Sequence, residues 1–195
     1  MKKFIILLLA VLMVVGLCVS CKEDPKVAPE ETVEDVVEST IDTFYLFGEY
    51  VYKLAYYEMD PTTVKAQMDE GIEDALEAEF EVPFSVQSVV TTTSINADIA
   101  DASNIKTLKV DISSLEYNET TESITGNFAV KATGREDGAT ITYDVSGKFD
   151  ITFEKQGAST ITYSSVKYCG TSYDIAAFNE AMKEALKDFP PTPTT

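Results

Sequence analysis

The sequence contains no histidine, and this absence excludes several kinds of chemistry at once. Hydrolases of the Ser-His-Asp and Cys-His types need histidine as their general base, and histidine is also the commonest side-chain ligand of metals. The sequence has no glycine-rich phosphate loop ending in Lys-Ser or Lys-Thr, and no Gly-x-Gly-x-x-Gly pattern. We therefore expect no cofactor and no metal, and interpret the protein as non-enzymatic.

Basic residues are also scarce, with 15 Lys and Arg against 33 Asp and Glu and a net charge of −18. Nucleic acids and bare anionic lipid surfaces repel a chain with this balance, so we expect no nucleic-acid partner. The simplest interpretation of the negative charge is a well-solvated surface.

Long apolar runs are limited to one, Phe4 to Val19, which follows Lys2 and Lys3. A basic start and a short apolar core are typical of a secretory signal, and the core is too short for a stable membrane-spanning helix. Ser20 and Cys21 come next, and residues 22–31 are mostly charged and contain two prolines. This order of residues resembles the lipobox of bacterial lipoproteins.

The resemblance covers residues 1–21 alone, and it implies cleavage before Cys21 and lipidation of that cysteine. Several acyl chains on one residue hold a protein to a membrane essentially permanently. We therefore predict a signal peptide over 1–20, a lipid-anchored flexible tether over 21–31, and a location in the bacterial cell envelope, facing the periplasm or the cell surface.

Cysteine is scarce as well, since the remaining two residues of this type are Cys18 and Cys169. Cys18 falls in the signal peptide, so Cys169 has no partner for an intramolecular disulfide and cannot form a zinc site alone. We interpret Cys169 as a small half-buried residue at the end of a strand. A reactive or intermolecular thiol is the alternative.

Apolar residues three or four apart predict two helices after the tether. Thr32 and Asp35 resemble a capping box at the start of the first helix, whose apolar stripe runs to Leu54. Asp60 can cap the second helix and Pro61 fits its first turn, and its stripe ends near residue 80. The short connection predicts an antiparallel helical hairpin.

After Pro83 the apolar period drops to two, which predicts strands. We expect about five strands in hairpin order over residues 84–93, 106–112, 124–132, 139–153 and 161–168, with a loop over 96–104. Gly147 and the parity shift between Tyr163 and Val166 indicate bulges. Each strand has one apolar and one polar face, as in an antiparallel sheet with one side in water.

A last apolar stripe predicts a C-terminal helix from Ile175 to Phe189, with Ser172 or Asp174 as its cap and Pro190 after its end. The predicted fold class is α+β: a helical hairpin, a curved antiparallel β-meander, and a C-terminal helix packed on the apolar face of the sheet. We place a single domain at residues 32–189 and a disordered tail at 190–195.

Tyrosines widen the apolar stripe of the first helix toward its C-terminal end. Aromatic rings at helical spacing usually pack against a core, so packing on the sheet is the simpler interpretation. The alternative is an apolar ligand held between this helix and the curved sheet, with a lining of Tyr45, Tyr52, Tyr56, Phe149 and Phe153.

The sequence thus favours a lipid-anchored envelope protein whose domain binds another protein or an apolar small molecule. One alternative is a structural or assembly lipoprotein that docks a basic partner through the acidic helix between Asp69 and Glu79. A hydrolase that works without histidine is a further alternative. Its weak support is two Ser-x-x-Lys spacings, at 103–106 and 164–167, which lack the companion motifs of penicillin-binding enzymes.

Overall fold

A computed structural model describes residues 32–136, 139–152 and 159–188. Two helices, α2 (Val33–Ala55) and α3 (Pro61–Phe80), precede the strands, and α4 (Ile175–Ala185) follows them with a short 3-10 turn, η2 (Leu186–Asp188). The strands are β1 (Phe84–Thr91), β2 (Ser94–Asp101), β3 (Thr107–Asn118), β4 (Ser123–Glu136), β5 (Ala139–Thr152), β6 (Thr160–Tyr168) and β7 (Thr171–Ser172). The predicted α+β class is confirmed.

Side chains that accept hydrogen bonds from backbone N–H groups cap the start of each helix. Thr32 and Asp35 form a reciprocal capping box at the start of α2, as predicted. The side chain of Asp60 accepts a hydrogen bond from the Thr63 N–H ahead of α3, and Asp174 caps α4 in the same way. None of the described helices is long and apolar enough to cross a membrane.

The seven strands form one antiparallel sheet in the order β1-β2-β3-β4-β5-β6-β7, so the predicted meander is confirmed with two more strands than expected. The predicted loop over 96–104 is wrong, because Ser94–Asp101 forms β2 and pairs with β1 through a two-residue turn. Ile95, Ala97 and Ile99 do alternate toward the core, but the small, polar residues between them weaken the strand signal. The other additional strand, β7, has only two residues.

Two bulges bend the sheet. The predicted irregularity at Gly147 is confirmed, because the β5–β6 register shifts between Ser146 and Gly147. A Cβ at Gly147 would lie 2.2 Å from the carbonyl oxygen of Thr162, so only glycine fits this close approach. The second bulge shifts the β3–β4 register between Ser113 and Glu116, and Ser114 has a φ of 55° there.

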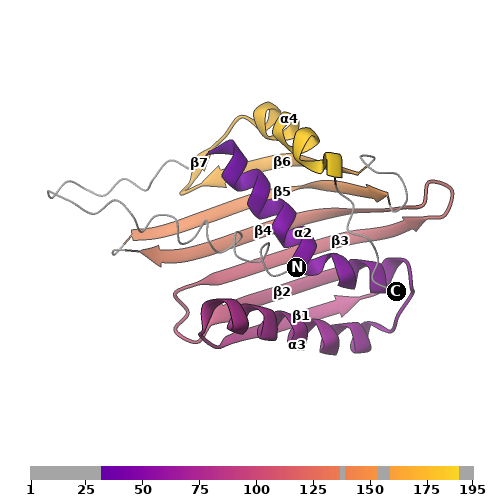
Figure 1. Cartoon of the computed structure of the whole chain (residues 1–195), viewed down its shortest axis with the longest axis horizontal. Coiled ribbons are helices and arrows are strands. Elements are labelled where there is room, and N and C mark those ends of the chain that lie inside the picture. The colour runs from indigo at the N-terminus through magenta and orange to yellow at the C-terminus, as the bar shows by residue number, and fades with distance from the viewer. Residues whose placement is uncertain (1–31, 137–138, 153–158, 189–195) are drawn as a thin grey trace, which may run out of the picture.

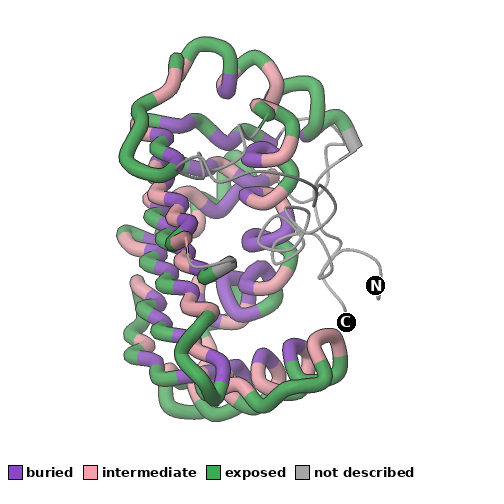
Figure 2. Tube along the Cα trace, turned by 90° about the vertical axis from the view of Figure 1, so that its left-hand side faces the viewer, coloured by how far each residue is buried: buried purple, intermediate pink, exposed green. Residues whose placement is uncertain are grey.

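All three helices lie on one side of the sheet. Figure 1 shows α2 crossing the sheet diagonally, α3 running along β1, and α4 lying beside β6. Helix α3 packs more extensively against β1 than against α2. Figure 2 shows the sheet from its end, with the described helices on one side and no described helix on the other. We call this uncovered side the outer face.

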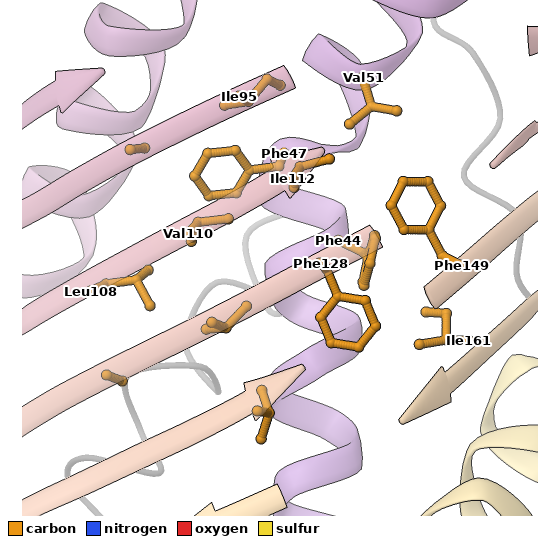
Figure 3. Close-up of a cluster of buried hydrophobic side chains, with 14 of the residues drawn as sticks. Phe44, Phe47, Val51, Ile95, Leu108, Val110, Ile112, Phe128, Phe149 and Ile161 are labelled. Atoms are coloured by element: carbon orange, nitrogen blue, oxygen red, sulfur yellow. The ribbon is translucent and has the colours of Figure 1, made fainter. Parts of the chain in front are cut away.

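The core fills the space between α2 and the sheet. Figure 3 shows Phe44, Phe47 and Val51 of α2 among apolar side chains that rise from the strands. The Phe44 ring meets the edges of the Phe128 and Phe149 rings, with centroids 5.3 and 5.0 Å away.

Helix side chains cover both edges of the sheet. The Val86 N–H in edge strand β1 donates to Glu73 Oε1 of α3 over 2.8 Å. On the opposite edge, the Tyr163 N–H of β6 donates to Asn179 Oδ1 of α4 over 2.7 Å, and Asn179 Nδ2 donates to the Tyr163 carbonyl over 3.4 Å. Strand addition is therefore blocked at these two points.

Candidate functional site

Strand alternation places most polar strand residues on the outer face. One part of this face is internally paired. In the register of β2 to β6, residues Asp98, Lys109, Lys131, Asp144 and Lys167 stand in one row across five strands. Lys109 Nζ lies 2.9 Å from Asp98 Oδ2, and Lys131 Nζ lies 3.3 Å from Asp144 Oδ2. Four of the five residues thus form two ion pairs, while Lys167 has no ion-pair partner among the described residues, and we call the row the paired row.

Beyond the paired row, toward the β3 bulge, the outer face is hollowed. An open groove of about 410 Å³ crosses β3, β4, β5 and β6, and we call it the outer groove. Its lining residues are Ser114, Glu116, Thr125, Gly126, Asn127, Lys148, Phe149, Asp150, Thr160 and Thr162. Eight of these ten residues carry a polar side chain.

Strand register explains why these residues meet. One cross-strand row consists of Glu116, Thr125, Asp150 and Thr160, which pair in turn across the four strands. The next row runs from Ser113 through Asn127 and Lys148 to Thr162. Neighbouring strands are about 4.8 Å apart, so the two rows form a compact field of polar groups.

The floor of the outer groove is backbone. Phe149 is 3% exposed, and its ring packs against Phe44 on the helix-covered face. Gly126 also belongs to that face, and a Cβ there would lie 2.6 Å from the Phe149 ring. A bulge increases the local twist of a strand, and the bulge at Ser114 lies at the β3 rim of the groove. We attribute the hollow to this local bend.

The polar side chains of the outer groove differ from the paired row in one respect. None of the eight makes a side-chain hydrogen bond or an ion pair with another residue in the part of the chain that the structure describes. Just outside the groove, Ser146 Oγ and Ser164 Oγ are 3.3 Å apart and bonded to each other. The groove therefore holds a concentrated set of unused donors and acceptors.

These groups suit the binding of a polar molecule. Hydroxyls and an amide both donate and accept hydrogen bonds, carboxylates accept them, and an ammonium donates them. Within the described residues, no group of three or more Cys, Asp or Glu side chains is arranged to hold a metal ion. The lining residues can offer hydrogen bonds of both directions to a polar molecule.

The structure does not bring the predicted aromatic lining around one described cavity. Tyr45 and Tyr56 are 40% and 42% exposed, whereas Tyr52 and Phe149 are buried. At about 100° per residue, the three tyrosines lie on a different stripe of α2 from Phe44, which is the contact of Phe149. Phe153 lies outside the described residues, so the ligand lining stays a prediction.

Two small cavities lie beneath the helices among the described residues. A cavity of about 10 Å³ lies near Leu76 and Leu108, and another of about 20 Å³ lies between Thr43 and Val130. Neither has room for more than about one water molecule. These two cavities give no space for an apolar ligand.

Three tyrosines gather at the C-terminal end of α2. The ring of Tyr56 stands edge-on to those of Tyr57 and Tyr117, with centroids 4.9 and 5.0 Å away. Tyr117 was not predicted as a member of this cluster, because it reaches the helix only through the pairing of β3 in the sheet. This cluster and the outer groove both involve the last residues of β3.

Asp42 is the most perturbed carboxyl group of the described residues. It is 4% exposed, and burial together with the nearby charge of Glu38 raises its pKa to about 7. Its Oδ2 atom has no hydrogen-bond partner among the described residues. A protonated Asp42 is therefore favoured at mildly acidic pH.

The remaining predicted features are placed as follows. Cys169 is exposed, so its interpretation as half-buried is wrong. It lies in the turn between β6 and β7 with a φ of 46°, which turns it out of the strand alternation that places Tyr168 in the core. Cys21, the signal peptide, the tether and the C-terminal tail lie outside the described residues.

The sequence matches no protein-family model and no curated protein, and no solved structure matches it. Function is therefore inferred from the residues of this chain alone.

Proposed function

We propose that the protein is a lipid-anchored protein of the bacterial cell envelope whose domain is a non-enzymatic binding module, with the outer groove as its ligand site. The observation that carries the binding role is the set of eight polar side chains that line the groove and have no partner among the described residues. Side-chain groups without protein partners are free to form hydrogen bonds with a ligand.

The anchor is supported by the lipobox resemblance that ends at Cys21. The segment after it, residues 22–31, is rich in charge and proline and cannot bury apolar surface. At about 3.1 Å per residue, an extended tether of this kind would hold the domain up to roughly 30 Å from the lipid. The outer groove then reaches molecules in the aqueous layer next to the membrane.

The size of the outer groove supports binding on the surface of the domain in preference to binding of an apolar ligand in its interior. Each of the two cavities described above has room for about one water molecule at most, whereas the volume of the outer groove falls within the usual range of ligand sites. This geometry favours a ligand that docks on the surface over an apolar molecule held in the two described cavities.

The anchor is tested by mass analysis of the N-terminal peptide of the protein extracted from membranes. We expect a peptide that begins at Cys21 and carries the added mass of acyl chains, and we expect Cys21→Ala to accumulate with its signal uncleaved. Protease treatment of intact cells then separates surface exposure from a periplasmic location. An unmodified cleaved peptide contradicts the anchor.

The binding role is tested by placing a photo-crosslinking benzoylphenylalanine on β6 of the full-length protein in living cells. Thr162 lies in the outer groove, and Lys167 lies on the same face about 16 Å further along the strand. We expect an adduct at position 162 and little at position 167. Equal yields at the two positions contradict the groove as the ligand site.

A second candidate is the docking role of α3, favoured by a stripe of exposed carboxylates at Glu70, Asp74, Glu77 and Glu81. Asp69 and Glu73 do not belong to it, because Asp69 accepts a hydrogen bond from Ser88 and Glu73 accepts one from the Val86 N–H. Replacing the four exposed acids by lysine should abolish crosslinking of α3 to a basic partner. Unchanged crosslinks would remove this candidate.

A further inference from the structure

We propose that the ligand of the outer groove is a neutral oligosaccharide, bound through hydrogen bonds to the two cross-strand rows of polar side chains. This inference rests on the proposed function, because it names the ligand class for the same groove. It is carried by the charge, the hydrogen-bonding capacity, the shape and the composition of the lining.

The lining carries charges of both signs, so no ligand of a single charge finds a uniformly complementary groove. The groove holds two carboxylates, Glu116 and Asp150, and one ammonium group, Lys148. Phosphates and other anions are repelled by the two carboxylates and by the chain as a whole, whose net charge is −18. A cation is attracted by the two carboxylates but repelled by Lys148, which stands between Asn127 and Thr162 in the second of the two rows. A neutral ligand avoids both penalties.

Hydrogen-bonding capacity matches a polyhydroxylated molecule. Each sugar hydroxyl donates one hydrogen bond and accepts others, and the groove offers both roles at short spacing. Asp150 and Glu116 can each accept from two neighbouring hydroxyls, Lys148 can donate to hydroxyl or ring oxygens, and Asn127 can do both. The hydroxyls of Ser114, Thr125, Thr160 and Thr162 adapt to either role by rotation.

The shape suits a ligand longer than a single ring. The groove crosses four strands, a width of about 14 Å at the usual strand spacing. Its polar residues are exposed or half-buried, so it is open to the solvent along its length. A stretch of a longer glycan chain can lie in such a groove, whereas a compact metabolite would leave most of the unpaired groups without a contact.

Composition argues against a polypeptide as the ligand. Protein interfaces depend on buried aromatic and arginine anchors, and the side chains that face the outer groove include neither. A peptide that adds a strand to the sheet needs a free edge, and Glu73 and Asn179 cover edges at Val86 and Tyr163. The lining therefore favours the hydroxyls of a sugar over the side chains of a protein.

The test uses the full-length protein in a detergent without a sugar head group. Chitotetraose, cellotetraose and maltotetraose are titrated separately, and binding is followed by saturation-transfer NMR on the ligand. The test variant is Asp150→Ala, and the matched control is Asp144→Ala, which changes the same residue type on the same face of β5 outside the groove. We expect at least one oligosaccharide to bind, Asp150→Ala to weaken it about tenfold, and Asp144→Ala to leave it within about twofold.

Three results would overturn the inference. If the oligosaccharide binds equally to both variants, it binds outside the groove. If no oligosaccharide binds while the crosslinker at Thr162 captures a polypeptide, the ligand is a protein, and the proposed binding role stands without the sugar. If no oligosaccharide binds and position 162 gives no adduct, the proposed function fails together with the inference.

Discussion

On the helix-covered face of the sheet, the rings of Phe128 and Phe149 pack against Phe44, with centroids 5.3 and 5.0 Å away. One residue away along the same strands, Asn127 and Lys148 turn to the outer face and make no side-chain hydrogen bond or ion pair with another described residue. The residues of both sets belong to the same backbone hydrogen-bond ladder between β4 and β5. The two faces therefore share a backbone and differ in whether their side chains have partners within the fold.

The paired row shows that a polar face does not have to leave its groups free. Lys131 and Asp144 are cross-strand neighbours that bond to each other. The outer groove has both signs of charge as well, at Lys148 and Asp150, yet they stay unpaired. Stability accordingly depends on the covered face, and binding is expected in the groove.

The largest expected effect breaks the covered face. Phe128→Ala removes a buried ring that contacts Phe44 and Tyr163, and such a cavity costs about 3–5 kcal/mol of unfolding free energy. Thr125→Ala, on the same strand and in the outer groove, should change it by less than about 0.5 kcal/mol. Urea unfolding measures both. Equal losses would contradict the assignment of stability to one face.

The next effect concerns Gly147 of β5, which lies opposite the bulge at Ser164 of β6. Gly147→Ala places a Cβ 2.2 Å from the Thr162 carbonyl oxygen and 2.8 Å from the Phe128 ring, so the strands must separate. Overpacking of this kind costs about 1–3 kcal/mol. The neighbouring outer-face change Ser146→Ala is the control, and we expect it to leave the unfolding midpoint nearly unchanged. A tolerated alanine at 147 would show that the close approach of β5 and β6 does not require glycine.

Asp42 gives an effect that depends on pH. Burial raises its pKa to about 7 in the folded protein, above the usual value near 3.9, so the folded state binds the proton more tightly than the unfolded state. The contribution of Asp42 to stability is therefore complete below about pH 4 and is lost as the pH rises through 7.

The corresponding variant is Asp42→Asn. We expect it to unfold like the parent at pH 4 and to be more stable by about 1–2 kcal/mol at pH 8, since its side chain carries no charge to desolvate. Glu70→Gln, an exposed change on α3, should show no such pH-dependent gain. Thermal unfolding across this pH range measures the difference, and parallel curves for parent and Asp42→Asn would rule out a buried ionisable Asp42.

The smallest expected effect concerns the paired row. Lys131→Ala breaks an ion pair whose side chains are 58% and 46% exposed, and exposed pairs contribute less than about 1 kcal/mol. A double-mutant cycle with Asp144→Ala measures the coupling free energy between Lys131 and Asp144, and this energy should decrease further in high salt. A large coupling would mean that the paired row, and not only the covered face, holds the fold together.

Periodicity in the sequence predicts most of the fold and little of the site. Buried positions are mostly apolar, so their spacing can be read from the sequence. This spacing gave the 3.6-residue stripes of α2, α3 and α4 and the two-residue alternation of β5. Strand β2 was missed because Ala97 and the small polar residues around it give a weak pattern. The bulge at Gly147 was found because a glycine and a change of parity mark it.

The outer groove escaped the sequence analysis for a different reason. Its residues are ordinary polar positions on strands, and Glu116 and Thr160 meet through three successive registers, one of which shifts at the Ser114 bulge. No local pattern in the sequence encodes that shift. Asp144 and Asp150 are likewise equivalent in sequence, and only the pairing of strands gives Asp144 a lysine partner on β4.

The most direct test of the outer groove as a ligand site is lysine labelling of the full-length protein in intact cells and after purification. Lys148 and Lys167 are both exposed on the outer face, and only Lys148 lies in the groove. A membrane-permeant amine reagent and peptide mass analysis give the labelled fraction of each. If a ligand occupies the groove, we expect Lys148 to be labelled severalfold less in cells than after purification, with Lys167 unchanged. Labelling of Lys148 that is the same in both samples would contradict the groove as a ligand site.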